Sequence, residues 1–297
     1  MTKTSSEPGP AVTLIVPAYN EAESLPSTMP ALVAFVRERG WRLVVVDDGS
    51  EDATSEVLSR YHHTDGVLIL RNKVRRGYGG AIKAGIRAVT TDLLVTVDAD
   101  GQHRVDDIET LYRVCLDTGA DMVIGDRGTR SSLFREFGKR LIRMITRLLM
   151  PLPIRDLNSG MKLYRADLAK RYIPVCPDSM AFSDVIALVF LHERHLVKEQ
   201  RIETRSRAGG RSTITTLTAF ETVMAILNII VLFNPMRVFF PLSIAFVTAG
   251  VAWGLPIVVR GLGVSPGALL AIVTGVLFFA LGLIAEQLSA LRKMRTD

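Results

Sequence analysis

The sequence predicts an α/β domain built on a mostly parallel sheet, followed by an interface helix and two C-terminal transmembrane helices. Up to residue 203, short apolar runs alternate with helical patterns, and such runs are typical of parallel strands buried on both faces in βαβ units. Further along, residues 238–259 and 261–285 contain no charged side chain. Each stretch reaches the roughly 20 apolar residues that a helix needs to cross a bilayer.

The elements of the α/β domain are predicted in order along the chain. Five strands are expected at Val12–Val16, Leu43–Val46, Val67–Leu70, Leu93–Val97 and Met122–Ile124, with helices between them at 22–39, 51–61, 79–89 and 105–118. A basic helix at 134–149, a strand at Met161–Tyr164, a helix at 182–194 and a strand at 197–203 come next. The predicted domain therefore covers residues 12–213, after a disordered N-terminus at 1–11.

The C-terminal part is predicted to consist of an interface helix at 214–235, a transmembrane hairpin at 236–290 and a tail at 291–297. The apolar segment 217–233 contains Glu221 and Asn228, so we expect it to lie in the membrane interface; a third span is the alternative. Small residues such as Gly250, Gly254 and Gly275 would let spans pack together; the alternative is that they are merely tolerated there. A homo-oligomer is among the expected partners.

Basic residues around the hairpin predict its orientation. Arg292, Lys293 and Arg295 follow the second span, whereas the connection between the spans, residues 260–267, holds one Arg. Because positively charged flanks stay in the cytoplasm, we expect both the α/β domain and the C-terminus on the cytoplasmic side of the membrane.

The net charge of +6 favours an anionic partner. A nucleic-acid-binding protein would combine basic clusters with a recognition motif; we find no such motif in the sequence, so no nucleic acid is expected. The densest basic cluster, from Arg127 to Arg147, occurs in a chain with membrane spans, and anionic headgroups attract such segments. We therefore expect a phosphate-bearing membrane ligand.

Polar clusters follow three of the predicted strands. They are Asn20 and Glu21 after the first strand, Asp47 and Asp48 after the second, and Asp98-Ala99-Asp100 after the fourth. Sheets of this kind bind ligands at the carboxyl ends of their strands, and a structural turn does not need repeated carboxylates. The sequence therefore predicts an active site at this edge. The glycine-rich stretch 77–80 lacks the GxGxxG spacing of a dinucleotide fold.

A metal site is predicted directly after the fourth strand. Asp98 and Asp100 are two positions apart, so both carboxylates can turn toward one cation, and Gln102 offers a neutral oxygen. Oxygen ligands of this kind suit Mg²⁺ or Mn²⁺, which bind through few carboxylates together with substrate phosphates. An Asp-rich turn without a metal is the alternative.

Four motifs together resemble a known family. They are Val16-Pro17-Ala18-Tyr19-Asn20-Glu21, Val46-Asp47-Asp48-Gly49-Ser50, Gly77-Tyr78-Gly79-Gly80-Ala81 and Asp98-Ala99-Asp100-Gly101-Gln102. Their order is similar to that of family 2 glycosyltransferases with the Rossmann-like GT-A fold, and most similar to dolichyl- and polyprenyl-phosphate mannose or glucose synthases. The resemblance covers residues 12–213, and the C-terminal hairpin resembles that of the two-span bacterial members.

The resemblance implies roles for particular residues. It implies nucleotide-sugar contacts for Pro17, Ala18, Tyr19, Glu21, Asp47, Asp48 and Asp98, metal ligation by Asp98, Asp100 and Gln102, and acceptor-phosphate contacts for Arg127, Arg140, Arg207 and Ser212. Asp156 matches the acidic residue of an Asp-x-x-Ser-Gly loop near the donor sugar, and with Asp100 it is the expected catalytic residue. The implied partners are a nucleotide-sugar donor, a polyprenyl phosphate lipid and the membrane.

The sequence departs from the family pattern in two places. Thr213 stands where the last basic loop of relatives usually has Lys, and Asp184 stands where relatives commonly have Glu. We find no Gln-x-x-Arg-Trp sequence, which processive members carry, so a single transfer is expected.

The implied reaction needs few catalytic side chains. A phosphate monoester, whose second pKa is about 6, arrives as a ready nucleophile, whereas a sugar hydroxyl would need a general base. We therefore expect an inverting single displacement on GDP-mannose or a UDP-sugar, with Asp156 as sugar-positioning residue or auxiliary base. The acceptor would be of the dolichyl or undecaprenyl phosphate type.

Three other functions agree with parts of the sequence. The first is transfer to another lipid or to a soluble sugar. The second is nucleotidyl transfer, although that class is expected to carry a Gly-rich phosphate loop where this chain has Pro17-Ala18-Tyr19-Asn20-Glu21. The third is a membrane scaffold that binds a nucleotide without catalysis.

Overall fold

A computed structural model describes residues 11–128, 154–203, 231 and 235–296. The described residues belong to two compact units, an α/β domain and a helical hairpin. Each unit is treated separately below. The predicted basic helix at 134–149 lies outside the described residues, as do nearly all of the predicted N-terminal segment 1–11 and interface helix 214–235.

The α/β domain is built on one sheet of seven strands, and the predicted mostly parallel sheet is confirmed. The strands are β1 (Val12–Ala18), β2 (Arg42–Asp47), β3 (Val67–Arg71), β4 (Leu93–Thr96), β5 (Met122–Asp126), β6 (Lys162–Arg165) and β7 (Val197–Arg201). Their order across the sheet is β3-β2-β1-β4-β6-β5-β7. Strand β6 runs antiparallel to both of its neighbours, and every other pair is parallel.

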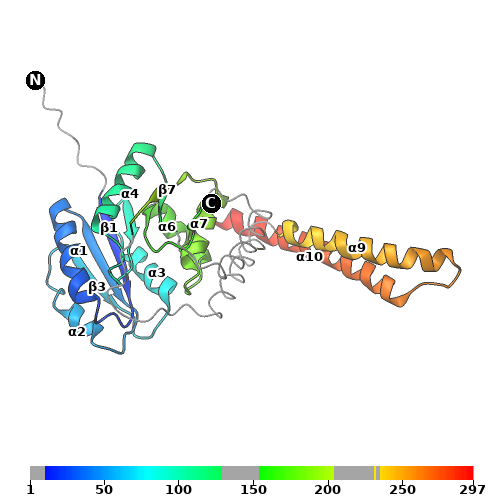
Figure 1. Cartoon of the computed structure of the whole chain (residues 1–297), viewed down its shortest axis with the longest axis horizontal. Coiled ribbons are helices and arrows are strands. Elements are labelled where there is room, and N and C mark those ends of the chain that lie inside the picture. The colour runs from blue at the N-terminus through cyan, green and yellow to red at the C-terminus, as the bar shows by residue number, and fades with distance from the viewer. Residues whose placement is uncertain (1–10, 129–153, 204–230, 232–234, 297) are drawn as a thin grey trace, which may run out of the picture. The chain divides into compact units, whose positions relative to one another are not determined.

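Helices cover both faces of the sheet (Figure 1). One face packs against α1 (Leu25–Arg39), α2 (Thr54–Ser59) and α4 (Val105–Thr118), and the other against α3 (Tyr78–Ala88), α6 (Ala166–Tyr172) and α7 (Phe182–His192). Alternate residues of β1 face opposite sides of the sheet: Leu14 belongs to the core under α1 and α4, whereas Ile15 faces α3. This two-sided burial explains the continuous apolar runs in the sequence.

Pro17 lies inside β1, one residue before its end, and not after the strand as predicted. The amide of Val97 donates to the carbonyl of Ile15, and the amide of Asp48 donates to the carbonyl of Ala18. The backbone N–H and C=O groups of the odd-numbered residues of β1 therefore point toward β4. Strand β4 has already ended at Thr96. The missing N–H of Pro17 therefore leaves no ladder bond unmade, and the strand continues.

Helix α6 and the following 3₁₀ turn, Ile173–Val175, were not predicted from the sequence. The buried positions of α6 include Ala166 and Ala169, and alanine gives a weak hydrophobic pattern. Pro174 then interrupts the apolar stretch. A seven-residue helix of this composition does not show a clear helical period.

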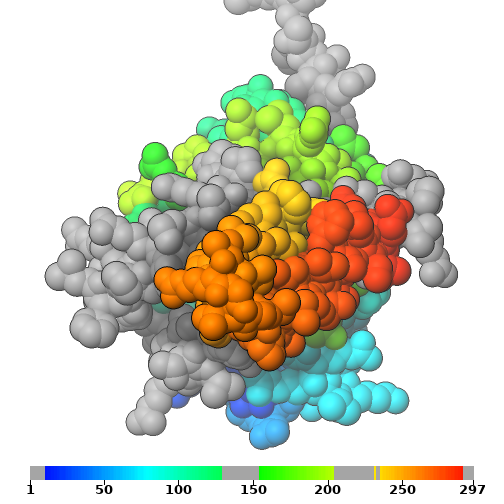
Figure 2. Space-filling model, turned by 90° about the vertical axis from the view of Figure 1, so that its right-hand side faces the viewer, coloured from blue at the N-terminus to red at the C-terminus, as the bar shows by residue number. Residues whose placement is uncertain are grey.

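The helical hairpin consists of α9 (Met236–Val259) and α10 (Pro266–Thr296), which run side by side (Figures 1 and 2). Both are long and apolar enough to cross a membrane. Large apolar side chains on them face outward, such as Trp253, which is 60% exposed, and Leu270, which is 67% exposed. Such exposure is unlike the core helix of a soluble domain.

Glycines allow α9 and α10 to approach each other closely. A Cβ added at Gly250 would lie 2.7 Å from Ile272 Cγ1, and one added at Gly275 would lie 2.6 Å from Val247 Cγ2. Gly250 and Gly275 therefore lie where the two helices of the hairpin pack together, as expected for small residues between spans.

Candidate active site

The carboxyl ends of β1, β2, β4 and β5 lie at one edge of the sheet, and the antiparallel strand β6 begins at the same edge. The segments that follow these four strands each contain a residue with positive φ: Asn20 (54°), Gly49 (72°), Gly101 (73°) and Gly128 (55°). Glycine reaches this backbone conformation at little cost. The fold therefore brings the four sequence motifs to one place.

Asp47 and Asp48 end β2 with their carboxylates directed into the protein. Asp47 Oδ1 accepts a hydrogen bond from the amide of Ser50 (2.9 Å). Asp48 Oδ1 accepts one from Asn72 Nδ2 (2.7 Å), and its Oδ2 accepts one from the amide of Gly77 (2.7 Å). Only 1% of Asp47 and 2% of Asp48 are exposed. These carboxylates order the loops around the predicted nucleotide pocket.

The loop after β1 places Tyr19 against a basic residue of another loop. The guanidinium of Arg75 lies over the Tyr19 ring, with 4.0 Å between its Cζ and the ring centroid, a cation–π contact. Glu21 Oε2 accepts a hydrogen bond from the Ser24 hydroxyl (2.6 Å). The other two predicted residues, Pro17 and Ala18, belong to β1. All four residues thus lie at the carboxyl edge.

Asp98 lies directly beyond β4, where three elements meet. Tyr78, at the start of α3, donates its hydroxyl to Asp98 Oδ1 (3.0 Å), and His103 Nε2 lies 3.4 Å from Oδ2. On the remaining side, a Cβ added at Gly160 would overlap the carboxylate. Burial alone would raise the pKa of Asp98, but its bonds to His103 and Tyr78 and the charge of Arg127 outweigh burial and lower it.

Asp100 and Gln102 lie in the turn that follows. The amide of Gln102 donates to Asp100 Oδ1 (3.1 Å), and both residues are partly exposed. No group of three or more His, Cys, Asp or Glu side chains in the described part of the chain forms a metal site by itself. Two carboxylates, one of them with a lowered pKa, nevertheless fit Mg²⁺ or Mn²⁺, whose other ligands come from water and substrate phosphates.

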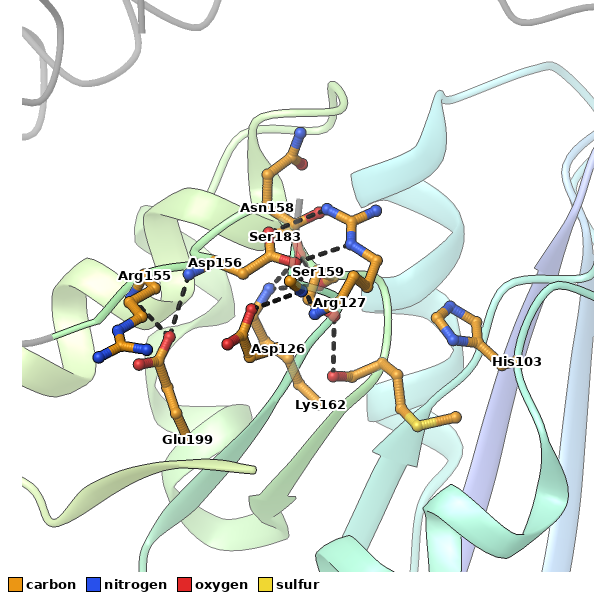
Figure 3. A network of polar contacts seen from close by, with 12 residues as sticks. His103, Asp126, Arg127, Arg155, Asp156, Asn158, Ser159, Lys162, Ser183 and Glu199 are labelled. Atoms are coloured by element: carbon orange, nitrogen blue, oxygen red, sulfur yellow. Dashed lines mark hydrogen bonds and ion pairs between the residues drawn. The ribbon is translucent and has the colours of Figure 1, made fainter. Parts of the chain in front are cut away.

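Arg127 and Asp156 form a bidentate ion pair (Figure 3), and the charge of Arg127 also acts on Asp98. Arg127 Nε donates to Asp156 Oδ2 (2.8 Å), and Nη2 donates to Asp156 Oδ1 (2.9 Å) and to the carbonyl of Asn158 (3.0 Å). Burial would raise the pKa of Asp156, but Arg127 outweighs burial and lowers it. The structure therefore joins two residues for which the sequence predicted separate roles.

Three predicted acceptor-phosphate residues, Arg140, Arg207 and Ser212, lie outside the described residues. The structure does not bear on their roles. Among the predicted site residues that it describes, it gathers those of the four motifs with Arg127 and Asp156 at the carboxyl edge.

Comparison with known protein families gives matches to both parts of the chain. The sequence model of the family described as glycosyl transferase family 2 matches residues 13–173, more than half of the 297 residues. The chain belongs to glycosyl transferase family 2. A second model, described as the GtrB C-terminal hairpin, matches residues 234–291, the region that contains α9 and most of α10. This glycosyl transferase family 2 chain thus combines the domain of that family with a C-terminal hairpin that matches a separate family model.

Curated relatives of this family 2 chain include enzymes with named activities. The undecaprenyl-phosphate 4-deoxy-4-formamido-L-arabinose transferase of Yersinia pestis is 30% identical over 190 residues, which cover 62% of this chain and 58% of that protein. The dolichyl-phosphate beta-glucosyltransferase of Trichomonas vaginalis is 31% identical over 175 residues, which cover 54% of each chain. The matches therefore span little more than half of the length of these relatives.

Solved structures support the fold of the family 2 domain. Glucosyl-3-phosphoglycerate synthase from Mycobacterium tuberculosis, crystallised with Mn²⁺, uridine diphosphate and phosphoglyceric acid, superposes with a TM-score of 0.59. It is 18% identical, and the match covers 75% of this chain and 79% of that chain. This likeness concerns the arrangement of the sheet and helices, which is of the GT-A type as predicted.

The structure adds four residues to the candidate site of this family 2 domain: Tyr78, His103, Gly160 and Lys162. Tyr78 and Gly160 belong to stretches singled out in the sequence, and His103 directly follows Gln102. Lys162 carried no such signal, because it lies in a short strand whose other residues look ordinary. Burial and partners, which only the fold reveals, single it out.

Proposed function

We propose that this chain transfers a hexose from a nucleotide-sugar, GDP-mannose or a UDP-sugar, to a polyprenyl phosphate of the dolichyl or undecaprenyl type at the membrane surface. The observation that carries the proposal is the presence, in one chain, of a glycosyl transferase family 2 domain and a matching C-terminal hairpin. Two curated relatives, named as polyprenyl-phosphate sugar transferases, support the choice of acceptor.

The donor would bind at the carboxyl edge of the sheet. Tyr19 with Arg75, and the loops ordered by Asp47 and Asp48, surround the place for the nucleoside. Asp98, Asp100 and Gln102 would hold Mg²⁺ or Mn²⁺ against the diphosphate. When bound, such an ion stabilises the charge that develops on the leaving nucleoside diphosphate. The M. tuberculosis enzyme named above binds Mn²⁺ with uridine diphosphate, which supports this assignment.

The acceptor brings its own nucleophile. A phosphate monoester with a second pKa of about 6 is largely a dianion at neutral pH, so no side chain needs to remove a proton from it. The state of Asp156 agrees with this chemistry, because a carboxylate held by Arg127 with a lowered pKa is a weak base. Of the two roles expected for Asp156, we therefore propose sugar positioning. Inversion at the anomeric carbon follows from a single displacement.

Arg127 has a second role in this proposal. Its hydrogen bonds within the described residues use Nε and Nη2, so Nη1 can face an incoming phosphate. Arg140, Arg207 and Ser212 are proposed as further acceptor-phosphate contacts. Arginine suits this task, because its planar guanidinium can contact two phosphate oxygens at once.

The hairpin would anchor the enzyme where the lipid phosphate emerges from the bilayer. Helices α9 and α10 are long enough to span it, and the basic residues after the second span favour a cytoplasmic C-terminus. We propose that the catalytic domain lies on the same side, where nucleotide-sugars are available. Association into a homo-oligomer would use the outward-facing side chains of the hairpin.

The test is a donor panel on the purified full-length protein in lipid nanodiscs. Labelled GDP-mannose, UDP-glucose and related donors are each incubated with undecaprenyl or dolichyl phosphate, with and without EDTA. The expected result is a labelled lipid product that requires metal and is lost in Asp100→Asn. A variant such as Arg87→Ala, on the exposed side of α3, serves as control and should remain active.

Nucleotide binding without any labelled lipid product from the whole panel would contradict the proposal. That result would favour the nucleotide-binding scaffold. A labelled product that forms only with soluble sugars or diacylglycerol would instead support a family 2 transferase with another acceptor.

A further inference from the structure

Lys162 is a charged residue in an unusual place. It is the first residue of β6 and is 0% exposed. Burial disfavours the charged form of a lysine, and it lowers the pKa of Lys162 despite the opposing charges of Asp184 and Asp156. An isolated ammonium group inside a protein is costly unless it is paired and hydrogen-bonded. The partners of Lys162 therefore indicate what it holds in place.

Those partners belong to the loop that leads into β6 and to α7 (Figure 3). Lys162 Nζ donates to the carbonyl of Ser159 (2.5 Å) and to the hydroxyl of Ser183. The Ser183 hydroxyl in turn donates to the same Ser159 carbonyl (2.7 Å). One backbone carbonyl thus accepts two hydrogen bonds, one of them from a buried cation, and Asp184 next to Ser183 supplies the counter-charge.

The clamped carbonyl lies one residue before Gly160, which contacts Asp98. A side chain at Gly160 would overlap the Asp98 carboxylate, so the backbone of Gly160 forms a wall of that site. The Gly160 carbonyl is also fixed, because it accepts a hydrogen bond from Thr96 Oγ1 (2.8 Å). The position of Asp98 therefore depends on the loop 156–160, whose Ser159 carbonyl is held by Lys162.

The same loop carries the Arg127–Asp156 pair at its other end. The amide of Asp156 donates to Glu199 Oε1 (3.0 Å), which ties that end to β7. The ammonium group of Lys162 also favours the ionised form of Asp156. Movement of the loop would therefore disturb both Asp98 and the ion pair.

We infer that Lys162 is a positioning residue: its buried amino group, held by the Ser159 carbonyl and the Ser183 hydroxyl, fixes the loop 156–160 and thereby the Asp98 carboxylate that would bind the divalent cation and donor diphosphate. The inference rests on the proposed function for the identity of the ligand. It assigns a role to a residue that is fully buried and that the predicted mechanism does not use.

The test separates positioning from stability with two variants. Lys162→Met alone removes the positive charge that favours the ionised form of the buried Asp184, so it is expected to lower thermal stability as well as activity. The double variant Lys162→Met/Asp184→Leu removes both buried charges and should recover much of the thermal stability, because apolar side chains can replace buried groups of opposite charge. The double variant still lacks the hydrogen bond that Lys162 Nζ donates to the Ser159 carbonyl in the wild type.

The decisive measurement is Mn²⁺ affinity in the presence of the nucleoside diphosphate that the wild type binds, by electron paramagnetic resonance. Partners that orient metal ligands typically contribute about 10- to 100-fold in affinity, so the folded double variant should bind Mn²⁺ at least about tenfold more weakly. Its kcat should fall with it. Wild-type Mn²⁺ affinity in the double variant would overturn the inference.

A milder variant covers the case in which the double variant does not fold. Ser183→Ala removes the hydroxyl that bridges Lys162 and the Ser159 carbonyl and should weaken Mn²⁺ binding to a smaller extent. Unchanged affinity there would overturn the inference too. If the wild type bound Mn²⁺ and nucleotide but transferred no sugar to lipid, the proposed function would fail, whereas the effect of Lys162 on Mn²⁺ affinity would still be measurable.

Discussion

At the residue scale, the site consists of carboxylates whose partners differ sharply. Asp48 accepts hydrogen bonds from neighbouring loops, Asp156 is held by a guanidinium, and Asp98 is held by a phenol and an imidazole. The sequence predicted Asp48 and Asp98 at strand ends, because an apolar run followed by Asp is visible in one dimension, and it predicted Asp156 in a polar loop that resembles the Asp-x-x-Ser-Gly loop of the family. It did not reveal their partners, because Asn72, Arg127 and Tyr78 approach them only through the fold.

The bond from Tyr78 to Asp98 leads to one prediction. Tyr78→Phe removes the hydroxyl donor but keeps the ring, so the Asp98 carboxylate becomes less well oriented for a cation. We expect Mn²⁺ affinity to drop by about tenfold, measured by metal titration of the full-length protein. Tyr112→Phe, on α4 beside Trp41, is the matched control and should leave the affinity unchanged.

The Arg127–Asp156 pair leads to a prediction about pH. The folded-state pKa of Asp156 is lowered, so the pair contributes stability above the unfolded pKa of about 3.9 and loses it as pH falls through the lower folded value. Asp156→Asn should therefore lower the free energy of unfolding by about 1–3 kcal/mol at pH 7, and the difference from wild type should shrink below pH of about 4.

Denaturant titrations at several pH values check this difference. A gap between wild type and Asp156→Asn that stayed constant down to the lowest measurable pH would contradict the lowered pKa. The same variant should keep the shape of the pH–rate profile, because Asp156 is proposed to position the sugar and not to act as a base.

At the element scale, the strands were easier to predict than their directions. Continuous apolar runs revealed β1 to β5. Strands β1, β2, β4 and β5 are largely buried on both faces, whereas β3, at the edge of the sheet, is apolar but partly exposed. The sequence pattern does not indicate that β6 is antiparallel, since the pattern of apolar residues in a strand of four residues is the same whether the strand runs parallel or antiparallel to its neighbours. Helix α4 was predicted with its observed bounds, Val105–Thr118, because its amphipathic pattern is long, whereas α6 was missed.

The approach of α3 to the sheet can be tested at Gly85. A Cβ there would lie 2.5 Å from Ile15 Cγ2, so Gly85→Ala must push α3 away from β1 even though alanine favours helix. Overpacking of this kind costs about 1–3 kcal/mol. We expect a lower thermal midpoint and weaker donor binding, because α3 carries Tyr78. Arg87→Ala, two residues further along α3 on its exposed side, should change neither quantity; an equally stable Gly85→Ala would refute the packing argument.

At the scale of the whole molecule, a soluble-type domain and an apolar hairpin share one chain. The contrast was visible in the sequence because charge disappears abruptly after Arg237, apart from Arg260, until Glu286. The acceptor side of the candidate site could be predicted only in part, because Arg140, Arg207 and Ser212 fall in segments whose sequence resembles the family less closely than the strand ends do.

The proposed membrane topology can be tested with introduced cysteines. The native Cys115 and Cys176 are free and buried, so they should react slowly with a membrane-impermeant maleimide. Leu68→Cys in the α/β domain and Leu262→Cys between the helices replace residues that are 45% and 72% exposed. We expect labelling of the two sites from opposite sides of sealed vesicles. Labelling of both from one side would contradict the two-span topology and would favour the third span considered for residues 217–233.

The place of β6 in the sheet has a consequence for how the protein is made. Strand β5 has no hydrogen-bonded neighbour among the strands that precede it in the chain; its neighbours are β6 and β7. When the ribosome has released residues up to 126, the sheet is therefore incomplete, because β4 still lacks its neighbouring strand β6, Lys162–Arg165. Gly160, the wall beside Asp98, arrives just before that segment, so the surroundings of Asp98 are completed only after more than half of the 297 residues have been made.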